Sequence, residues 1–208
     1  MPIYLLATLD TKGHEIAFVR DRLTELGIET RIVDCGCLGE PLVRADIDRE
    51  QVYAAAGTTL DEVRAKNDRG LAVTKAAEGA ATLVKKHFDD GRVQGVLGIG
   101  GSAGTIIGTA AMRALPLGVP KLMVSTLAAG QVRQYVGEKD IFMLNAVADI
   151  SGLNRISRTV LSNAARAMAG LVTLAPRRTA IPSRASSSTR RAARPGACWL
   201  AGLPGQRR

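Results

Sequence analysis

Short, continuous apolar runs recur along the chain, and each is followed by a segment with the periodicity of a helix or by a loop. Strands that are covered on both faces carry such runs, because both of their sides are buried. Strand, loop, helix and strand in this order predict right-handed crossover units and a parallel sheet. We therefore predict a Rossmann-like, doubly wound α/β fold with a mostly parallel sheet and flanking helices. The runs are IYLLATL (3–9), ETRIVDCG (29–36), VQGVLGIG (93–100), VPKLMVST (119–126) and IFMLNAV (141–147).

Helices are predicted between the runs because apolar residues recur there at every third or fourth position. Only 3% of the residues are aromatic, so the core must consist of small side chains, which suits helices packed closely on a sheet. Thr59 is predicted to be the N-cap of a helix. Residues 38–59 lack the helical periodicity, so we expect a functional excursion or lid over these residues rather than a core element. The predicted apolar faces comprise Ile16, Val19, Leu23 and Leu26; Val73, Ala77, Ala80, Val84 and Phe88; and Ile156, Val160, Ala164, Met168 and Leu171.

The formal net charge of +9 is concentrated at the C-terminus. Eight of the 28 basic residues and no acidic residue lie in 176–208, so 20 basic and 19 acidic residues leave a net charge of +1 in 1–175. The body of the protein therefore lacks the charge signature of a polyanion-binding protein. We predict one nucleotide-binding α/β domain over residues 1–175 and a basic tail over residues 176–208.

The tail, PRRTAIPSRASSSTRRAARPGACWLAGLPGQRR, has no helical or alternating periodicity, and we expect it to be disordered. Nucleic-acid binding through its arginines is the less favoured alternative, because Trp199 is its only aromatic residue for base stacking. The abrupt change in composition also supports the hypothesis that an out-of-frame translation has replaced a native continuation. Sequencing the locus around codon 175 tests that hypothesis.

Membrane insertion and metal or redox chemistry are not predicted. No stretch reaches the roughly 18 apolar residues of a membrane span, and no basic segment precedes the first run. We therefore expect a cytoplasmic protein without a membrane partner. Cys35 and Cys37 form a C-x-C pattern with no neighbouring histidine to complete a zinc site, so they and Cys198 are expected to be free structural thiols.

Three of the strand-to-helix loops have unusual compositions: DTKGHE (10–15), GIGGSAGT (98–105) and STLAAG (125–130). In a parallel sheet the carboxyl ends of the strands share one edge, and ligands bind outside that edge. We therefore expect these three loops to lie together around a ligand.

The glycine-rich loop is the strongest candidate for contact with a phosphate. Glycines let backbone N–H groups approach an anion closely, and the following helix N-terminus adds unpaired donors and a partial positive charge. The loop formally fits the dinucleotide fingerprint, but it follows a later strand and lacks the acidic ribose partner; the lysine of a P-loop is also missing. The alternative is that the glycines only permit a tight turn and close helix packing. The candidate residues are Gly98, Gly100, Gly101, Ser102, Ala103, Gly104 and Thr105.

The other two loops add polar candidates. Asp10 or Thr11 is predicted to cap the first helix, Lys12 to point at a phosphate, and Gly13 to keep the approach open, with an ordinary helix cap and solvated charges as the alternative. Ser125 and Thr126 offer hydroxyl groups.

Two further residues lie outside these loops. Asp149 is predicted to coordinate a metal carried by the nucleotide or to accept from a sugar hydroxyl, with a cap of the last helix as the alternative. His87, beside two lysines at a helix end, is expected to be exposed.

Four ordered motifs, LATLDTKGHE, VLGIGGSAGT, KLMVSTLAAG and DIFMLNAVADISGLNRISRTVLSNAA, together resemble the N-terminal domain of the Tm-one-like ATP-binding family. The family is named for a tomato mosaic virus resistance protein, and the resemblance covers about residues 2–174. It implies a Rossmann-like nucleotide-binding domain, ATP as the ligand and a tendency to dimerise. By motif match, the resemblance implies that Lys12 and Gly13, the glycine loop, and Ser125 with Thr126 form the ligand shell.

The family brings no defined reaction, and its members continue into a second α/β domain that nothing after Ala175 resembles. We therefore predict an ATP- and Mg²⁺-binding module, truncated before the second domain and forming a homo-oligomer. The alternative is the half-site of a hydrolase or transferase that needs the missing domain. Whether the chain is an enzyme stays open.

Overall fold

The computed structural model describes residues 1–173. The predictions for the tail, including Cys198 and Trp199, lie outside the described residues. Five parallel strands form one sheet in the order β2-β1-β3-β4-β5. Their bounds are β1 Ile3–Ala7, β2 Thr30–Asp34, β3 Gly95–Gly100, β4 Lys121–Ser125 and β5 Phe142–Asn145. The predicted doubly wound α/β fold with a parallel sheet is confirmed.

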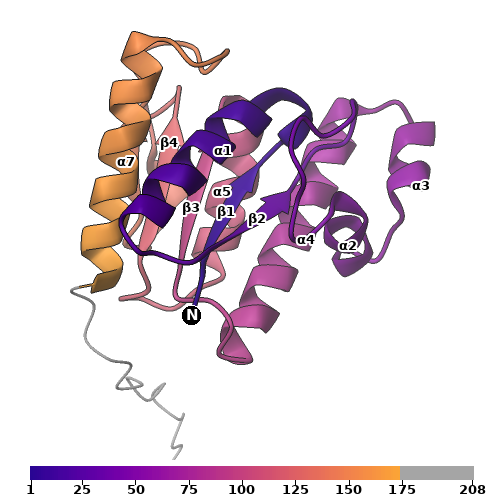
Figure 1. Ribbon diagram of the computed structural model, residues 1–208. Coiled ribbons are helices and arrows are strands. Elements are labelled where there is room, and N and C mark those ends of the chain that lie inside the picture. The colour runs from indigo at the N-terminus through magenta and orange to yellow at the C-terminus, as the bar shows by residue number, and fades with distance from the viewer. Residues whose placement is uncertain (174–208) are drawn as a thin grey trace, which may run out of the picture. The chain divides into compact units, whose positions relative to one another are not determined.

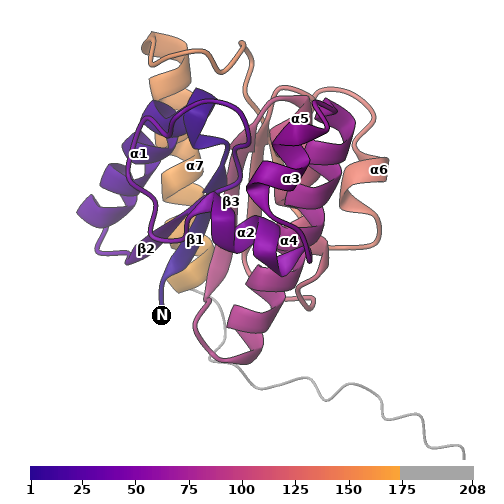
Figure 2. The ribbon, with the colours of Figure 1, turned by 90° about the vertical axis from the view of Figure 1, so that its right-hand side faces the viewer.

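Helices cover both faces of the sheet and form two hydrophobic cores (Figures 1 and 2). Helices α1 and α7 pack on one face, while α4 and α5, with the shorter α2 and α3, pack on the other. The helices are α1 Leu9–Glu25, α2 Arg49–Ala55, α3 Leu60–Ala65, α4 Arg69–Asp89, α5 Ser102–Arg113, α6 Arg133–Val136 and α7 Arg155–Thr173. Because α1 and α5 follow neighbouring strands but lie on opposite faces, the chain diverges at the carboxyl ends of β1 and β3.

The expectation that residues 38–59 form no core element is wrong. Helix α2 lies in this segment, and its Val52 and Tyr53 are fully buried. Ile47 extends the sheet through a parallel bridge to Val33. The sequence pattern was too weak to show this because a seven-residue helix completes only two turns, too few for a stripe to repeat.

Two predictions about helix positions are also corrected. The segment DTKGHE is not a loop, because α1 already begins at Leu9 and bends at Lys12, which has non-helical backbone angles. In α7 the buried face carries Leu161, Ala165 and Met168, whereas Ile156 is 51% exposed. Its neighbour Ser157 is buried instead, so the buried face of α7 is rotated relative to the predicted one.

An ion pair between a buried lysine and a partly exposed aspartate lies at the amino end of β4. Lys121 is fully buried and donates hydrogen bonds to the carbonyl oxygens of Pro116 and Val119, both at 2.8 Å. Its Nζ also lies 2.7 Å from Oδ1 of Asp140, whose Oδ2 accepts a hydrogen bond from the Gly118 N–H at 2.7 Å. Burial opposes ionisation of Asp140, but the bonds from Lys121 and Gly118 outweigh it and hold the pKa of this carboxyl below its ordinary value.

This depressed pKa predicts a loss of stability in acid. A carboxyl whose pKa is lower in the folded than in the unfolded state stabilises the protein above the unfolded value of about 3.9, and the contribution is lost as pH falls through the folded value. We expect the free energy of unfolding to fall less steeply between about pH 5 and pH 3 in Asp140→Asn than in the wild type, as measured by urea denaturation. Asp61→Asn on α3, where Asp61 forms no ion pair within residues 1–173, is the control. Equal slopes in all three proteins would contradict the prediction.

Candidate functional site

A cavity of about 200 Å³ lies at the carboxyl ends of β1 and β2, beside the start of α5. In a doubly wound sheet with this strand order, the crevice at the switch point between β1 and β3 is the usual ligand site. One side of the cavity comes from the start of α1, with Thr8, Asp10 and Thr11. The remaining lining residues are Cys35, Cys37, Leu38, Tyr53, Arg69, Ala72, Val73, Ala76, Ala103 and Ile107.

The cavity combines a polar and an apolar wall. On the polar side the hydroxyl oxygens of Thr8 and Thr11 are 2.8 Å apart and share a hydrogen bond. On the apolar side lie small residues of α4 and Ile107 of α5. Arg69, the first residue of α4, is exposed and has no carboxylate partner within the described residues. The arrangement suits a ligand with one anionic part and one apolar part.

Helix α5 begins beside this cavity without a side-chain cap. Its N-cap residue is Gly101, and the first backbone bond into the helix runs from the Thr105 N–H to the Gly101 oxygen at 2.8 Å. Helices α2, α3 and α4 are instead capped by the side chains of Asp48, Thr59 and Asp68, which confirms the predicted cap at Thr59. An uncapped helix N-terminus leaves N–H donors and a partial positive charge for an anion.

The glycines of the loop have two different roles. A β-carbon on Gly98 would lie 2.6 Å from the sulfur of Met123, one on Gly100 would lie 2.6 Å from the Gly104 Cα, and one on Gly104 would lie 3.2 Å from the Ile99 oxygen. These three glycines therefore permit close packing of α5 on the sheet, as the alternative interpretation predicted. For Gly101 the nearest atom is the hydroxyl oxygen of Thr126 at 3.7 Å, so packing does not require a glycine there.

Neither Asp10 nor Thr11 caps α1 as predicted, because the helix begins at Leu9 and its N-cap is Thr8, without a side-chain bond. Oxygen Oδ2 of Asp10 accepts hydrogen bonds from the backbone N–H groups of Leu38 and Gly39, both at 3.2 Å, and so holds the loop after β2. Oxygen Oδ1 is buried and has no hydrogen-bond partner among the described residues. An unsatisfied carboxylate oxygen beside a cavity is a candidate contact for a ligand or a cation.

Asp34 lies next to Asp10 and is almost fully buried. A β-carbon on Gly36 would lie 3.0 Å from Oδ1 of Asp34 and 3.1 Å from Oδ1 of Asp10, so the two carboxylates flank this glycine. Burial raises the pKa of Asp34, and hydrogen bonds from the N–H groups of Gly36 and Leu9 oppose the rise. Sequence reasoning did not select Asp34, because it lies inside a strand run.

The remaining residues of the first loop are placed as follows. Thr11 hydrogen-bonds Thr8 and lines the cavity. Lys12 is half-buried at the bend of α1 and makes no ion pair within residues 1–173. Gly13 is buried, and a β-carbon there would lie 2.8 Å from the Leu42 Cβ, so Gly13 lets the loop after β2 pack on α1. Contact of Lys12 and Gly13 with a phosphate stays a prediction.

The structure brings the loop after β4 next to the glycine loop. The Ser125 and Thr105 hydroxyl oxygens are 2.6 Å apart and both side chains are fully buried, so this pair ties β4 to α5. The half-buried Thr126 lies beside Gly101. Ser102 is exposed and Ala103 lines the cavity. Direct contact of these residues with a ligand stays a prediction.

Asp149 lies in the loop between β5 and α7, two strands away from β3, and is exposed. The oxygen of the Asn154 side chain accepts hydrogen bonds from the N–H groups of Ile156 and Ser157, both at 2.9 Å, so Asn154 caps α7. The alternative role of Asp149 as the cap is therefore wrong, while its role at a ligand or metal stays a prediction.

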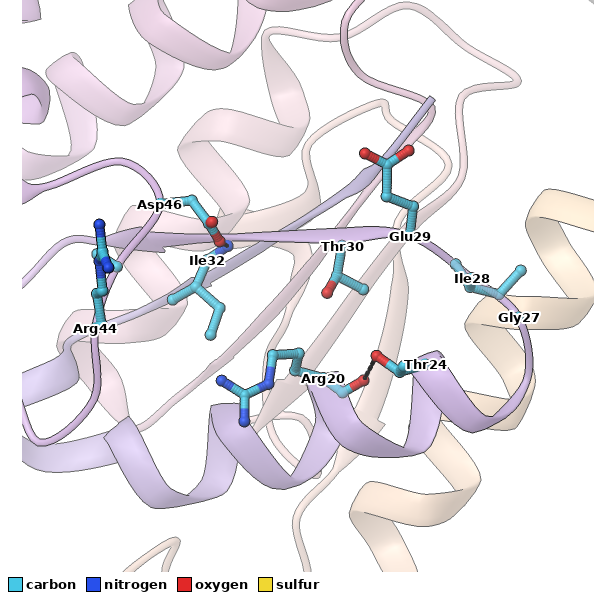
Figure 3. Close-up of a pocket in the computed structure, with 10 residues that line it drawn as sticks. Arg20, Thr24, Gly27, Ile28, Glu29, Thr30, Ile32, Arg44 and Asp46 are labelled. Carbon is cyan, nitrogen blue, oxygen red and sulfur yellow. Dashed lines mark hydrogen bonds between the residues drawn. The ribbon is translucent and has the colours of Figure 1, made fainter.

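A larger cavity of about 710 Å³ lies at the amino end of β2, between this strand and α1 (Figure 3). Arg20 extends from α1 beneath Ile32, and the Thr24 hydroxyl donates to the Arg20 carbonyl oxygen at 2.9 Å. Arg20 is already paired with Asp21 at 2.8 Å, and the lining mixes both signs of charge. Because ligands of such folds bind at the carboxyl ends of the strands, we assign the site to the smaller cavity.

The structure defines a doubly wound α/β domain with a cavity at its switch point. The chain belongs to the uncharacterised protein family UPF0261, whose N-terminal domain matches residues 1–177.

The chain is similar to full-length bacterial members of this family. It is 46% identical to a UPF0261 protein of Clostridium tetani over 170 residues, and 43% identical to one of Mesorhizobium japonicum over 169 residues. These matches cover 82% and 81% of this chain and 42% of each relative. The chain thus spans less than half the length of the curated relatives it matches.

Tomato proteins are also relatives, in agreement with the resemblance seen in the motifs. The ToMV susceptible protein tm-1(GCR26) of Solanum lycopersicum is 41% identical over 188 residues, covering 82% of this chain and 24% of the tomato protein. The ToMV resistance protein Tm-1(GCR237) is 42% identical over 104 residues, covering 50% of this chain and 14% of that protein.

Residues 1–173 contain neither a helix that could span a membrane nor a cluster of metal-binding side chains. None of their helices combines the length and the apolar character that a bilayer crossing requires. No three His, Cys, Asp or Glu side chains in this part of the chain come close enough together to bind a metal ion. Cys35 and Cys37 are free thiols, as expected.

Proposed function

We propose that the domain binds a nucleotide, ATP with Mg²⁺, at the switch point. The uncapped N-terminus of α5 at Gly101 carries this proposal, because it is open to an anion and lies beside the cavity. The phosphates would contact the N–H groups at the start of α5, and Lys12 and Thr126 would add donors. The apolar wall of α4 and α5 would hold the base.

The residues present also fit a magnesium ion that arrives with the nucleotide. Mg²⁺ is usually bound by one or two carboxylates together with phosphate oxygens and water, so it needs no cluster of three protein ligands. The buried Oδ1 of Asp10 lacks a partner within the described chain and would supply one such carboxylate oxygen. When bound, the ion would neutralise phosphate charge, while Asp10 would fix its position.

Titration of the 208-residue protein with ATP and Mg²⁺ in a calorimeter tests the proposal. We expect binding heat and a rise in the unfolding temperature, with affinity falling from ATP to ADP to adenosine, because the phosphates provide most of the interaction. If millimolar ATP produces no binding heat and no thermal shift, the proposed site in this chain is ruled out.

A second candidate is the half-site of a hydrolase or transferase. The length of the relatives favours this candidate, because the chain matches only 42% of each bacterial relative and the remainder could supply the other half of the site. A binding module and an enzyme differ in whether ATP is consumed. Release of ADP and phosphate during incubation with the protein would favour the enzyme, and intact ATP after saturation would favour the binding module.

A further inference from the structure

A groove of about 450 Å³ lies at the opposite end of the sheet from the proposed nucleotide site, between β2, α2 and the second half of α4. It shares no lining residue with the switch-point cavity. Arg31 comes from β2, Gln51 from α2, and Lys86 from α4. The other lining residues are Asp46, Ile47, Ala55, Thr82, Leu83, His87 and Arg92.

Positive charge dominates the groove. Arg31 and Lys86 are exposed and form no ion pair within residues 1–173, whereas Arg92 is paired with Asp90 at 2.7 Å. Asp46 is the single carboxylate of the lining, and its Oδ2 accepts a hydrogen bond from the Ile32 N–H at 2.7 Å. Asp46 is therefore engaged with the edge of β2, where Figure 3 shows it beside Ile32.

The three cations line the groove together with His87. Partial burial lowers the pKa of His87 below its ordinary value. The charges of Arg92, Lys86 and Arg31 lower it further, and Asp90 acts in the opposite direction. All three cations thus lie near enough to act on the same point in the groove.

A partly buried hydrogen bond holds this histidine in place. The Tyr4 oxygen lies 2.8 Å from Nδ1 of His87, and the two rings meet edge to face at 5.7 Å. Tyr4 is fully buried in β1, so the imidazole is anchored to the sheet, and the expectation that His87 is simply exposed is wrong. Nε2 is the ring nitrogen that Tyr4 leaves free.

We propose that this groove binds a small phosphate ester. Guanidinium and ammonium groups form charge-assisted hydrogen bonds with phosphate oxygens, and Arg31, Lys86 and Arg92 supply these groups from three positions. Gln51 and Thr82 add neutral polar groups, and Ile47, Ala55 and Leu83 line the groove with apolar surface for a carbon skeleton. Asp46 would repel the continuing backbone of a polymer, which favours a small molecule over a nucleic acid.

Titration with inorganic phosphate and pyrophosphate, followed by two-dimensional NMR of backbone amides, tests this proposal. Ionic strength is held constant with chloride. We expect saturable shifts in the groove, and affinity about tenfold lower in Arg31→Gln and in Lys86→Gln, since each removes one charged hydrogen-bond donor. Both side chains are exposed, so the fold should survive, which the unfolding temperature checks.

Lys85→Gln is the matched control. Lys85 is the neighbouring residue on α4, carries the same charge and is paired with Asp89, but does not line the groove. Its substitution should leave phosphate affinity unchanged. Shifts no larger than those in chloride, or equal losses in Lys85→Gln and Lys86→Gln, would overturn the proposal. Tighter, strongly salt-dependent binding of a single-stranded oligonucleotide would overturn it in favour of a polymer surface.

The pKa of His87 provides an independent readout. Phosphate should raise it, because the anion offsets the cations around the ring, and the imidazole resonances report it directly. The charged or titratable groups that face His87 or line the same groove are Tyr4, Arg31, Asp46, Lys86, Asp90 and Arg92. An unchanged pKa at saturating phosphate would show that the anion binds elsewhere.

Discussion

Replacement of Gly101 by Asp is expected to weaken ATP binding strongly while the domain remains at least as stable as the wild type. Gly101 is the N-cap of α5, and a β-carbon there meets nothing closer than the Thr126 hydroxyl at 3.7 Å. Asp is a better N-cap than Gly and its charge is favourable at a helix N-terminus, so stability should rise by a few tenths of a kcal/mol. The same carboxylate would occupy the N–H donors and repel phosphate, which should weaken binding about 100-fold or more.

The opposite signs of the two effects make this variant informative. Urea denaturation measures the first effect and calorimetry with ATP and Mg²⁺ the second. Gly130→Asp is the control, because it adds the same charge to the neighbouring loop after β4, where a β-carbon would lie 3.6 Å from the nearest atom. If Gly101→Asp binds ATP as tightly as Gly130→Asp, the phosphate does not lie at α5. Gly104 is unsuitable for this test, because a larger residue would collide with the Ile99 oxygen.

The nucleotide site and the basic groove can be separated with the same proteins. Gly101→Asp should leave inorganic phosphate binding at the groove unchanged, because it alters no residue there. Lys86→Gln should leave ATP binding at the switch point unchanged for the same reason. A variant that weakens both would mean that the two anions share one site.

The sheet could be predicted from sequence because buried parallel strands have a local signature. Continuous apolar runs identified all five strands, and their order along the chain indicated crossovers. Helix α2 was missed because its pattern is short, and its burial depends on contact with α4, which is distant in sequence. The exposure of Ile156 likewise depends on which side of α7 faces the sheet, since the adjacent Ser157 is buried instead. Local periodicity does not contain that information.

The position of the candidate site was also predictable, but the roles of its residues were not. Parallel strands bring their carboxyl ends together, so the convergence of the loops follows from topology. Gly98 and Gly101 look alike in sequence, and only Met123 on the neighbouring strand shows that Gly98 is required for packing. Asp10 resembled a helix cap because its partners, the N–H groups of Leu38 and Gly39, lie in another loop.

Gly79→Ala is expected to cause the largest loss of stability. A β-carbon at Gly79 of α4 would lie 1.9 Å from the backbone oxygen of Val52 and 2.8 Å from its carbonyl carbon. Since the opposing atoms belong to the main chain, no change of rotamer relieves the collision, and α2 must move away from α4. Overpacking that shifts the backbone should cost about 3 kcal/mol, despite the higher helix propensity of Ala.

Gly170→Ala provides the matched control, because it makes the same change inside another helix. No described atom lies within 4 Å of a β-carbon at Gly170 of α7, so the substitution should stabilise the protein by about 0.5–1 kcal/mol through helix propensity and chain entropy. Urea denaturation of both variants measures this difference in sign. Because α2 carries Tyr53 and α4 carries Ala76, both of which line the switch-point cavity, Gly79→Ala should also weaken ATP binding. Equal stabilisation by both substitutions would show that α2 does not pack on α4 in solution, and that the cavity lacks the part of its lining that Tyr53 supplies.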